Sequence, residues 1–189
     1  PIVIHSIHGF GFTRYQSLPV RRMLVALECL AAKVTKRFIA VSDANRRLGV
    51  EIGLFPESRC TVIRSGVDVA AIRRLEVDTT AKKRELGLEP GRPVVGMVAP
   101  MKPQKAPLDF VRVAAKVAGK KPETQFLFVG DGELRDAMED EIDRLNLTKS
   151  FRLAGWRRDV PAVMRCLDVF VLTSLWEGLP RVYLEALAS

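Results

Sequence analysis

Two glutamates near the carboxyl end of the chain have the residue type and spacing for ligand binding. Glu177 is followed by Gly178, and Glu185 lies eight positions after Glu177 in a segment rich in alanine and leucine. Eight positions would be just over two turns if the helix were continuous, and both carboxylates could then accept hydrogen bonds from the hydroxyls of one polyol. The structural alternative is a pair of acids near a helix start, which the helix dipole favours without any ligand.

The residues around Glu177 predict a strand, a loop and then a helix. The run 168–172 is apolar and β-branched like a buried strand, and Pro180 is placed to begin a helix. In a parallel α/β sheet, ligands bind where such a loop leaves a strand, because the next helix points unpaired N–H groups there. Gly178 would let the backbone approach that ligand closely.

The order of residue types in this stretch is more specific than its spacing. It resembles the E-x7-E signature of glycosyltransferases of GT-B fold, in particular the large retaining family 4, the glycosyl transferases group 1. The matching residues are Glu177, Gly178, Leu179, Pro180 and Glu185. The resemblance implies that Glu177 holds the donor sugar, that Glu185 holds the nucleotide ribose, and that the residues after Glu177 line the donor site.

Length and composition predict a globular chain. With 189 residues, 48% of them hydrophobic, the chain can bury a core in one large or two small domains. Its apolar runs are too short and too interrupted by charge to span a membrane, and no signal peptide is visible, so we expect a cytoplasmic protein. The sequence begins at Pro1 without a methionine and stops at Ser189 within an expected helix, so we also expect a fragment of a longer protein.

The formal net charge of +8 is compatible with several anionic partners. A basic surface can meet nucleotide phosphates, acidic saccharides, or lipid headgroups through peripheral membrane contact. Nucleic acid is suggested by the charge alone, and we expect no nucleic-acid partner because no RNA- or DNA-binding motif accompanies it. The three cysteines show no CxxC pairing, which predicts buried free thiols in a reducing compartment.

The first strand-like run, residues 2–7, leads into a loop in which Gly9 and Gly11 flank an aromatic residue. On chemistry alone, a lone histidine such as His8 at a strand end is a structural residue. Family 4 enzymes, however, often have a histidine-glycine loop at this place, on the amino-terminal domain and facing the cleft. The resemblance therefore implies a catalytic role for His8 and an acceptor-side position for Gly9 and Gly11.

Pro19 is placed to begin a helix whose apolar residues recur at intervals of three and four. This stripe predicts a core-facing surface and consists of Val20, Met23, Leu24, Leu27, Leu30, Ala31 and Val34. A buried strand over 38–41 follows, then Ser42 as the cap of the next helix and a short strand over 61–63. The turn at 65–68 also resembles family 4.

The segment 76–93 is interpreted as a linker, because charges of both signs mix in it and it ends in a run rich in proline and glycine. Thr79 and Thr80 are expected to cap a short helix within it. The resemblance to family 4 then implies that residues 1–75 are the carboxyl-terminal part of an acceptor-side Rossmann-like domain. It implies that residues 94–189 are a truncated Rossmann-like domain that binds the nucleotide sugar.

Four strand-like runs alternate with helical segments in the last part of the chain. They cover 94–98, 126–129, 151–153 and 169–172. This alternation predicts an α/β fold with a parallel, Rossmann-like sheet and right-handed crossovers. The resemblance to family 4 implies the GT-B type of this fold, with the ligand site at the carboxyl ends of the strands.

The loop after the first of these strands carries Lys102 and Lys105, just before a helix expected over 108–118. Because lysine is unfavourable for the dipole at a helix start, these lysines suggest a bound anion. Family 4 normally has an arginine and, five residues later, a lysine on the donor pyrophosphate. Lys105 matches that lysine, whereas Pro100 stands in the arginine position, so Lys102 would have to substitute for the arginine.

The loop after the second strand contains a G-x-G pair, which by itself is a weak sign of a phosphate loop. Four residues of this loop resemble the G-[DE]-G-x-L motif that lines the nucleotide side of the cleft in family 4: Gly130, Gly132, Glu133 and Leu134. After the third strand, Arg157 either contacts the nucleotide base region or belongs to a solvated turn before an aspartate-capped helix.

The resemblance to family 4 implies a glycosyltransferase that moves a sugar from a UDP- or GDP-sugar to an acceptor hydroxyl with retention. The expected acceptor is a saccharide, a lipid-linked hydroxyl or another hydroxyl. Lys105 and Lys102 would neutralise the phosphates, so no metal or other cofactor is expected, and no D-x-D pair is present to bind a metal. A non-catalytic nucleotide- or carbohydrate-binding module stays open as the alternative, because Pro100 replaces the arginine.

Overall fold

The computed structural model describes residues 2–189 of the chain. Its internal contacts divide the chain into two compact units, each made of two separate stretches of sequence. The first unit comprises Pro1–Gly66 and Glu177–Arg181, and the second comprises Val67–Trp176 and Val182–Ser189.

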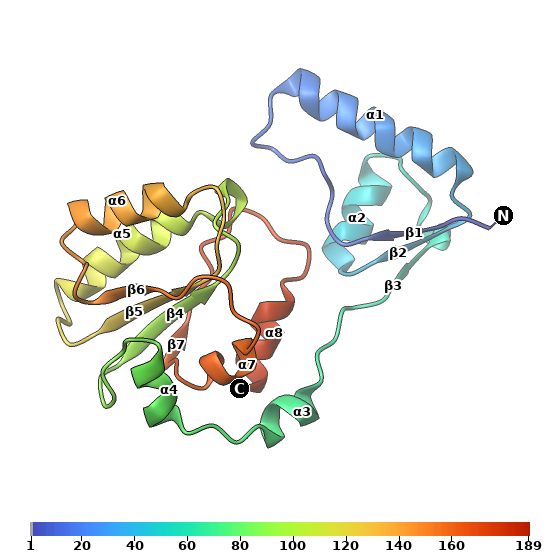
Figure 1. The fold of residues 1–189 in the computed structure, drawn as a ribbon. Helices are drawn as coiled ribbons and strands as arrows, with labels where there is room; N and C mark the ends of the chain where they lie inside the picture. Colours follow the sequence, from blue (N-terminus) through green and yellow to red (C-terminus); the bar gives the residue numbers. More distant parts are fainter. Residues whose placement is uncertain (1) are drawn as a thin grey trace. The chain divides into compact units, whose positions relative to one another are not determined.

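The first unit is built on a sheet of three parallel strands (Figure 1). In chain order its first stretch contains β1 (Ile4–Ile7), α1 (Leu18–Val34), β2 (Arg37–Ala40), α2 (Asp43–Glu51), the 3-10 helix η1 (Glu57–Arg59) and β3 (Cys60–Val62). The central strand is β2, in which Ala40 is aligned with Ile7 of β1 and Phe38 with Cys60 of β3. The helices supply the crossover connections that parallel strands require.

Aromatic packing on the sheet holds the first unit together. The rings of Phe38 in β2 and Phe55 lie with their centroids 4.4 Å apart, and both side chains are buried. Ile7 and Ala40 complete the buried layer along the strands. The predicted cap of α2 is confirmed, because the Ser42 hydroxyl accepts a hydrogen bond from the Asn45 backbone N–H at 3.2 Å.

The prediction that the apolar stripe of α1 faces a core is wrong for this unit. Five members of the stripe are well exposed: Val20 (42%), Met23 (55%), Leu27 (55%), Leu30 (61%) and Val34 (71%). The core contacts of α1 come instead from Ala32 and the partly buried Cys29. A helical repeat shows which residues share a face but does not show which layer covers it, and in this unit the sheet covers another face.

The second unit contains a four-stranded sheet with helices on both faces. Its elements are α3 (Val69–Arg74), α4 (Thr79–Glu85), β4 (Val94–Val98), the 3-10 helix η2 (Pro103–Lys105), α5 (Pro107–Ala118), β5 (Gln125–Val129), α6 (Arg135–Arg144), β6 (Phe151–Leu153), α7 (Val160–Met164), β7 (Val169–Phe170) and, from Val182 onward, α8 (Arg181–Ala188). The strand order is β6-β5-β4-β7, and every pairing is parallel. The predicted parallel, Rossmann-like sheet is therefore confirmed, although β7 ends two residues before the expected limit at 172.

The sheet separates the core of the second unit into two layers, and β5 contributes to both because alternate side chains of a strand point to opposite faces. Phe126 and Phe128 pack with Phe110 of α5 on one face. Leu127 and Val129 pack on the other face, in a second cluster near α4 and α7. Figure 1 shows α5 and α6 on one side of this sheet and α4 and α7 on the other. Complete burial of β5 fits a strand covered on both faces.

The cap of α4 differs from the expected one. Asp78, not Thr79 or Thr80, is the N-cap residue, and its Oδ1 accepts a hydrogen bond from the Ala81 backbone N–H at 2.9 Å. Aspartate is preferred to threonine at the N-cap position of a helix, which explains why Asp78 is the cap. The helix packs in the second unit, where Leu86 after it is buried. The boundaries 1–75, 76–93 and 94–189 stay a prediction.

Within residues 2–189, no helix combines the length and the apolar character needed to cross a bilayer. The three cysteines are free; Cys60 and Cys166 are buried, and Cys29 is partly exposed. Burial raises the pKa of the Cys60 and Cys166 thiols, which keeps both in the protonated form at neutral pH.

Candidate functional site

The loops that follow the four parallel strands of the second unit meet at one edge of the sheet. Backbone bonds join three of these loops. Met101 after β4 donates its N–H to the Asp131 carbonyl after β5 at 2.9 Å, and Leu134 donates back to the Met101 carbonyl at 3.1 Å. Gly130 donates to the carbonyl of Gly155, after β6, at 2.8 Å. This edge is where ligands bind in sheets of this type.

The two glycines of the G-x-G pair are required by close backbone packing. Gly130 has φ +139°, and a Cβ there would lie 1.9 Å from the Ala99 carbonyl oxygen. Gly132 has φ +150°, and a Cβ there would lie 2.7 Å from the Met101 carbonyl oxygen. Both glycines therefore hold the β5 loop against the β4 loop. Their proposed contact with a nucleotide stays a prediction.

We expect Gly130→Ala to destabilise the protein by roughly 3 kcal/mol, because the new methyl group meets backbone atoms and the residue keeps a strained φ. Urea unfolding measures the change in free energy. Gly119→Ala is the matched control, since Gly119 at the end of α5 has φ −64° and a Cβ there meets nothing closer than 3.6 Å. An equal loss in both variants would contradict the role given to Gly130.

Lys102 and Lys105 lie on the loop between β4 and α5. Lys102 is exposed and is the N-cap residue of η2, whereas Lys105 is half-buried and is the last residue of η2. Ala106 follows in the left-handed conformation, with φ 44° and ψ 52°, and α5 begins at Pro107. The expected helix after Lys105 is confirmed, one residue longer at its start than the sequence suggested.

Glu133 and Leu134 continue the loop after β5. Glu133 is exposed, and the half-buried Leu134 is the N-cap residue of α6. Asp131, between the two glycines, forms an ion pair of 3.1 Å with Arg135 in the first turn of α6. The motif thus packs against the Lys102–Lys105 loop and leads directly into a helix.

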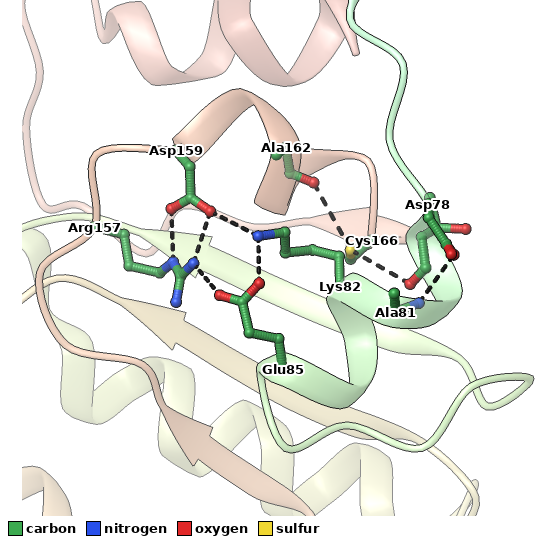
Figure 2. A network of polar contacts seen from close by, with 9 residues as sticks. Asp78, Ala81, Lys82, Glu85, Arg157, Asp159, Ala162 and Cys166 are labelled. Carbon is green, nitrogen blue, oxygen red and sulfur yellow. Dashed lines mark hydrogen bonds and ion pairs between the residues drawn. The ribbon is translucent and has the colours of Figure 1, made fainter.

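Arg157 belongs to a network of charges that joins the loop after β6 to α4 (Figure 2). Its guanidinium donates to both carboxylate oxygens of Asp159, at 2.7 Å each, and to Glu85 at 2.5 Å. Lys82 bridges the same two acids, at 3.1 Å from Asp159 and 2.5 Å from Glu85. The Arg157 side chain is only 21% exposed in this network, so the structure shows an ion-paired turn and not a simply solvated one. A contact with the nucleotide base stays a prediction.

The network shifts the pKa of each member toward its charged form. The hydrogen bonds from Arg157, and then from Lys82, hold the Asp159 pKa well below its usual range. Lys82 first and Arg157 second lower the Glu85 pKa. Asp159 stands at the N-cap position of α7 but makes no side-chain capping bond, because Arg157 and Lys82 occupy its oxygens.

This network predicts a specific pH dependence for Asp159→Asn. Because folding lowers the Asp159 pKa, the carboxylate stabilises the folded state at pH values above its ordinary pKa of 3.8. That stabilisation is lost as the pH falls toward the folded-state pKa. We therefore expect the variant to be less stable by about 1 kcal/mol at pH 7, a small value because the carboxylate is partly exposed. Thermal unfolding between pH 7 and pH 3 should show the difference shrinking. A constant difference, or the same change in the exposed control Asp140→Asn, would contradict this prediction.

The histidine-glycine loop belongs to the first unit, as does Glu177–Arg181. His8 is exposed, and its Nε2 lies 3.2 Å from the Ser6 hydroxyl oxygen. Gly9 has φ +151°. Within this unit Gly178 packs on the loop backbone, since a Cβ at Gly178 would lie 1.9 Å from the His8 carbonyl oxygen. Glycine at 178 is thus explained by a protein contact as well as by the proposed ligand.

The E-x7-E stretch is not one continuous helix. Helix α8 begins at Arg181, directly after Pro180, so Glu177 lies in the preceding loop and Glu185 lies in the helix. Both acids are half-buried, as are Leu179 and Pro180. The loop predicted at Glu177 and the helix predicted after it are therefore confirmed, with the helix starting one residue after Pro180. Because Glu177 lies outside the helix, the two-turn spacing does not describe the two acids, and their roles rest on the resemblance to family 4.

Two residues at this edge were missed by the sequence analysis. Gln104 and Thr173 connect the loop after β4 to the loop after β7 through side-chain hydrogen bonds. Neither residue belongs to a motif, and they lie far apart in sequence, so no local pattern signals them. Among residues 2–189 no group of three or more His, Cys, Asp or Glu side chains is arranged to hold a metal ion.

The fold is that of the GT-B glycosyltransferases. The crystal structure of Anabaena Alr3699/HepE in complex with UDP and glucose matches with a TM-score of 0.84 at 23% identity, over 99% of this chain and 50% of that chain. That of WaaG, a glycosyltransferase involved in lipopolysaccharide biosynthesis, matches with a TM-score of 0.81 at 15% identity, over 98% of this chain and 54% of that chain.

The chain belongs to the glycosyl transferases group 1 family, whose profile matches residues 78–189. A relative from Escherichia coli, UDP-Gal:alpha-D-GlcNAc-diphosphoundecaprenol alpha-1,3-galactosyltransferase, is 35% identical over 98% of this chain and 49% of its own length. The 2-deoxystreptamine N-acetyl-D-glucosaminyltransferase of Streptomyces fradiae is 36% identical over 64% of this chain and 29% of its own length. The chain thus spans about half the length, or less, of these curated relatives.

Proposed function

We propose that the whole protein transfers a glycosyl group from a nucleotide sugar to an acceptor hydroxyl, with retention and without a metal ion. Membership of the glycosyl transferases group 1 family is the observation that carries this proposal. The proposed donor is a UDP- or GDP-sugar. A UDP-sugar is supported by the galactosyltransferase relative and by the HepE complex with UDP and glucose.

The proposed acceptor is a saccharide or a lipid-linked sugar. The E. coli relative is named for an acceptor of the second kind, a sugar on diphosphoundecaprenol. A hydroxyl of such an acceptor would attack the anomeric carbon of the donor while the bond to the nucleoside diphosphate breaks. His8, Gly9 and Gly11 are assigned to the acceptor side by their likeness to the family loop.

The chemical step creates negative charge on the departing diphosphate and positive, oxocarbenium-like character on the sugar. Lys105 is assigned to the diphosphate, and Lys102, three residues earlier in the same loop, is assigned to assist it. A fixed positive charge stabilises the leaving group most when the charge on it is greatest, which is in the transition state. No metal ion is then needed for this task.

The two glutamates are assigned to different parts of the donor. Glu177 would accept hydrogen bonds from the sugar hydroxyls, and Glu185 would accept them from the ribose hydroxyls. A charged acceptor strengthens such bonds and fixes the donor orientation. Gly130, Gly132, Glu133 and Leu134 would border the nucleotide, because their loop packs on the loop that carries Lys105.

Binding of a panel of nucleotide sugars to the complete protein tests the donor assignment. Isothermal titration calorimetry with UDP-, GDP- and ADP-sugars is expected to show one preferred base, and the same donor should be hydrolysed or transferred. Binding without turnover of any donor would favour the alternative, a non-catalytic nucleotide-binding module with Pro100 in place of the arginine. Absence of nucleotide-sugar binding would contradict the proposed function.

A further inference from the structure

Hydrogen bonds connect two loops at the edge of the second sheet where the carboxyl ends of its strands lie. One loop runs from β4 to α5 and carries Lys105, and the other follows β7. The Leu175 backbone N–H donates to the Gln104 carbonyl at 2.8 Å, and the Gln104 side-chain Nε2 donates to the Trp176 carbonyl at 3.0 Å. Gln104 thus uses both its backbone and its side chain to hold the second loop. The residue after Trp176 in the sequence is Glu177.

Thr173 makes the complementary contacts from the β7 loop to the β4 loop. Its hydroxyl oxygen lies 3.0 Å from the Lys105 carbonyl oxygen and 2.9 Å from the Ala106 carbonyl oxygen. A hydroxyl has a single proton, so these distances describe a three-centre bond directed at two successive carbonyls. The Met97 Sδ lies 3.4 Å from the same hydroxyl. The hydroxyl of Thr173 thus contacts two carbonyls of the loop after β4 and the sulfur of a residue in β4 itself.

The segment that Thr173 holds has an unusual backbone. Ala106 is left-handed, with φ 44° and ψ 52°, and such a conformation is uncommon for a residue with a Cβ. A strained residue persists only where its surroundings fix it, and such residues cluster at functional sites. The two carbonyls bonded by Thr173 flank Ala106, so they fix the direction in which the chain leaves Lys105.

We propose that Thr173 and Gln104 are positioning residues of the transfer reaction. They act through Lys105 by holding its backbone on the β7 loop, so that the lysine is placed before the donor binds. This inference rests on the proposed function, in which Lys105 meets the donor diphosphate. Preorganised charge is effective in catalysis because it needs no rearrangement during the reaction, and small displacements are costly.

The test compares Thr173→Val with Thr173→Ser in the complete protein. Valine keeps the shape of threonine and removes the hydroxyl, whereas serine keeps the hydroxyl. We expect Thr173→Val to lower kcat for the preferred donor about tenfold and to weaken UDP binding, with serine within about twofold of the unaltered protein. Gln104→Met, which removes the side-chain donor, is expected to change kcat in the same direction.

Thr35→Val is the matched control for the loss of a hydroxyl bond. Thr35 is buried in the first unit, and its hydroxyl donates to the Ala31 carbonyl at 2.9 Å. This variant should lower the unfolding midpoint about as much as Thr173→Val while leaving kcat and UDP binding unchanged. A merely structural role for Thr173 would give the same result for both valine variants and would overturn the inference.

A double-mutant cycle tests whether Thr173 acts through Lys105. In the Lys105→Ala background, Thr173→Val should lower kcat and UDP affinity by less than about threefold, because the group that it positions is gone. Equal factors in both backgrounds, or a serine variant as impaired as the valine variant, would contradict the proposal. If the unaltered protein transfers no sugar, the proposed function is contradicted. The coupling of Thr173 to Lys105 is then still tested by comparing the UDP affinities of the same variants.

Discussion

Lys105→Ala in the complete protein is expected to lower kcat by roughly 30- to 1000-fold, with a smaller increase in KM for the donor. The lost interaction is a charge on the departing diphosphate, which is typically worth about 2–4 kcal/mol in the transition state. Because the charge on the leaving group grows as the bond breaks, the loss falls mainly on kcat. Steady-state kinetics with the preferred nucleotide sugar measures both constants.

Lys116→Ala is the matched control for this prediction. Lys116 is exposed in the last turn of α5, the helix that begins just after Lys105, so its loss changes the net charge equally. Its kcat should match that of the unaltered protein. If Lys102 compensates for Pro100, Lys102→Ala should show a smaller decrease of the same kind as Lys105→Ala. A normal kcat in Lys105→Ala would remove this lysine from the mechanism.

Glu185→Gln and Glu177→Gln are expected to separate nucleotide binding from sugar transfer. Glu185 is assigned to the ribose, a contact already present in the ground state, so Glu185→Gln should weaken binding of the free nucleoside diphosphate. Glu177 is assigned to the sugar, so Glu177→Gln should leave that affinity nearly unchanged and raise the barrier to transfer by about 1–3 kcal/mol. Calorimetry with UDP and steady-state kinetics measure the two effects.

Glu123→Gln, at an exposed position before β5, is the control that removes a carboxylate charge away from the strand ends that carry the loops. Glu123→Gln should change neither the affinity for the nucleoside diphosphate nor the rate of sugar transfer. Equal loss of nucleotide affinity in both Glu177→Gln and Glu185→Gln would contradict the division of roles. Normal transfer in both would leave the helix-start explanation as the better account of these acids.

The second sheet was predictable because its signal is local. Apolar runs at 94–98, 126–129 and 151–153 correspond to β4, β5 and β6, and their alternation with helical segments required parallel pairing. Ser42 as a helix cap was equally local, since the bond joins residues three positions apart. Short sequence motifs identified Lys105 and the G-x-G pair as loop residues, and the structure brings their loops to one edge of the sheet.

The remaining features depend on contacts between distant residues. The apolar repeat of α1 is real, but its burial depends on which layer covers it, and the sheet contacts Ala32 instead. The helix expected to open at Pro180 is present as α8 from Arg181, but the eight-residue interval between Glu177 and Glu185 does not place the two acids on one helix, because Glu177 lies in the preceding loop. Thr173 reaches the β4 loop across about 70 residues of sequence, which no local pattern can reveal.

The anomeric configuration of the product shows whether the complete protein transfers a sugar with retention. The complete protein would be incubated with its preferred α-linked nucleotide sugar and an acceptor, and the new glycosidic linkage followed by proton NMR together with release of the nucleoside diphosphate. We expect an α-linked product formed at the same rate as the nucleoside diphosphate, in buffer containing a chelator. A β-linked product, a requirement for added metal, or nucleotide binding without any transfer would contradict it.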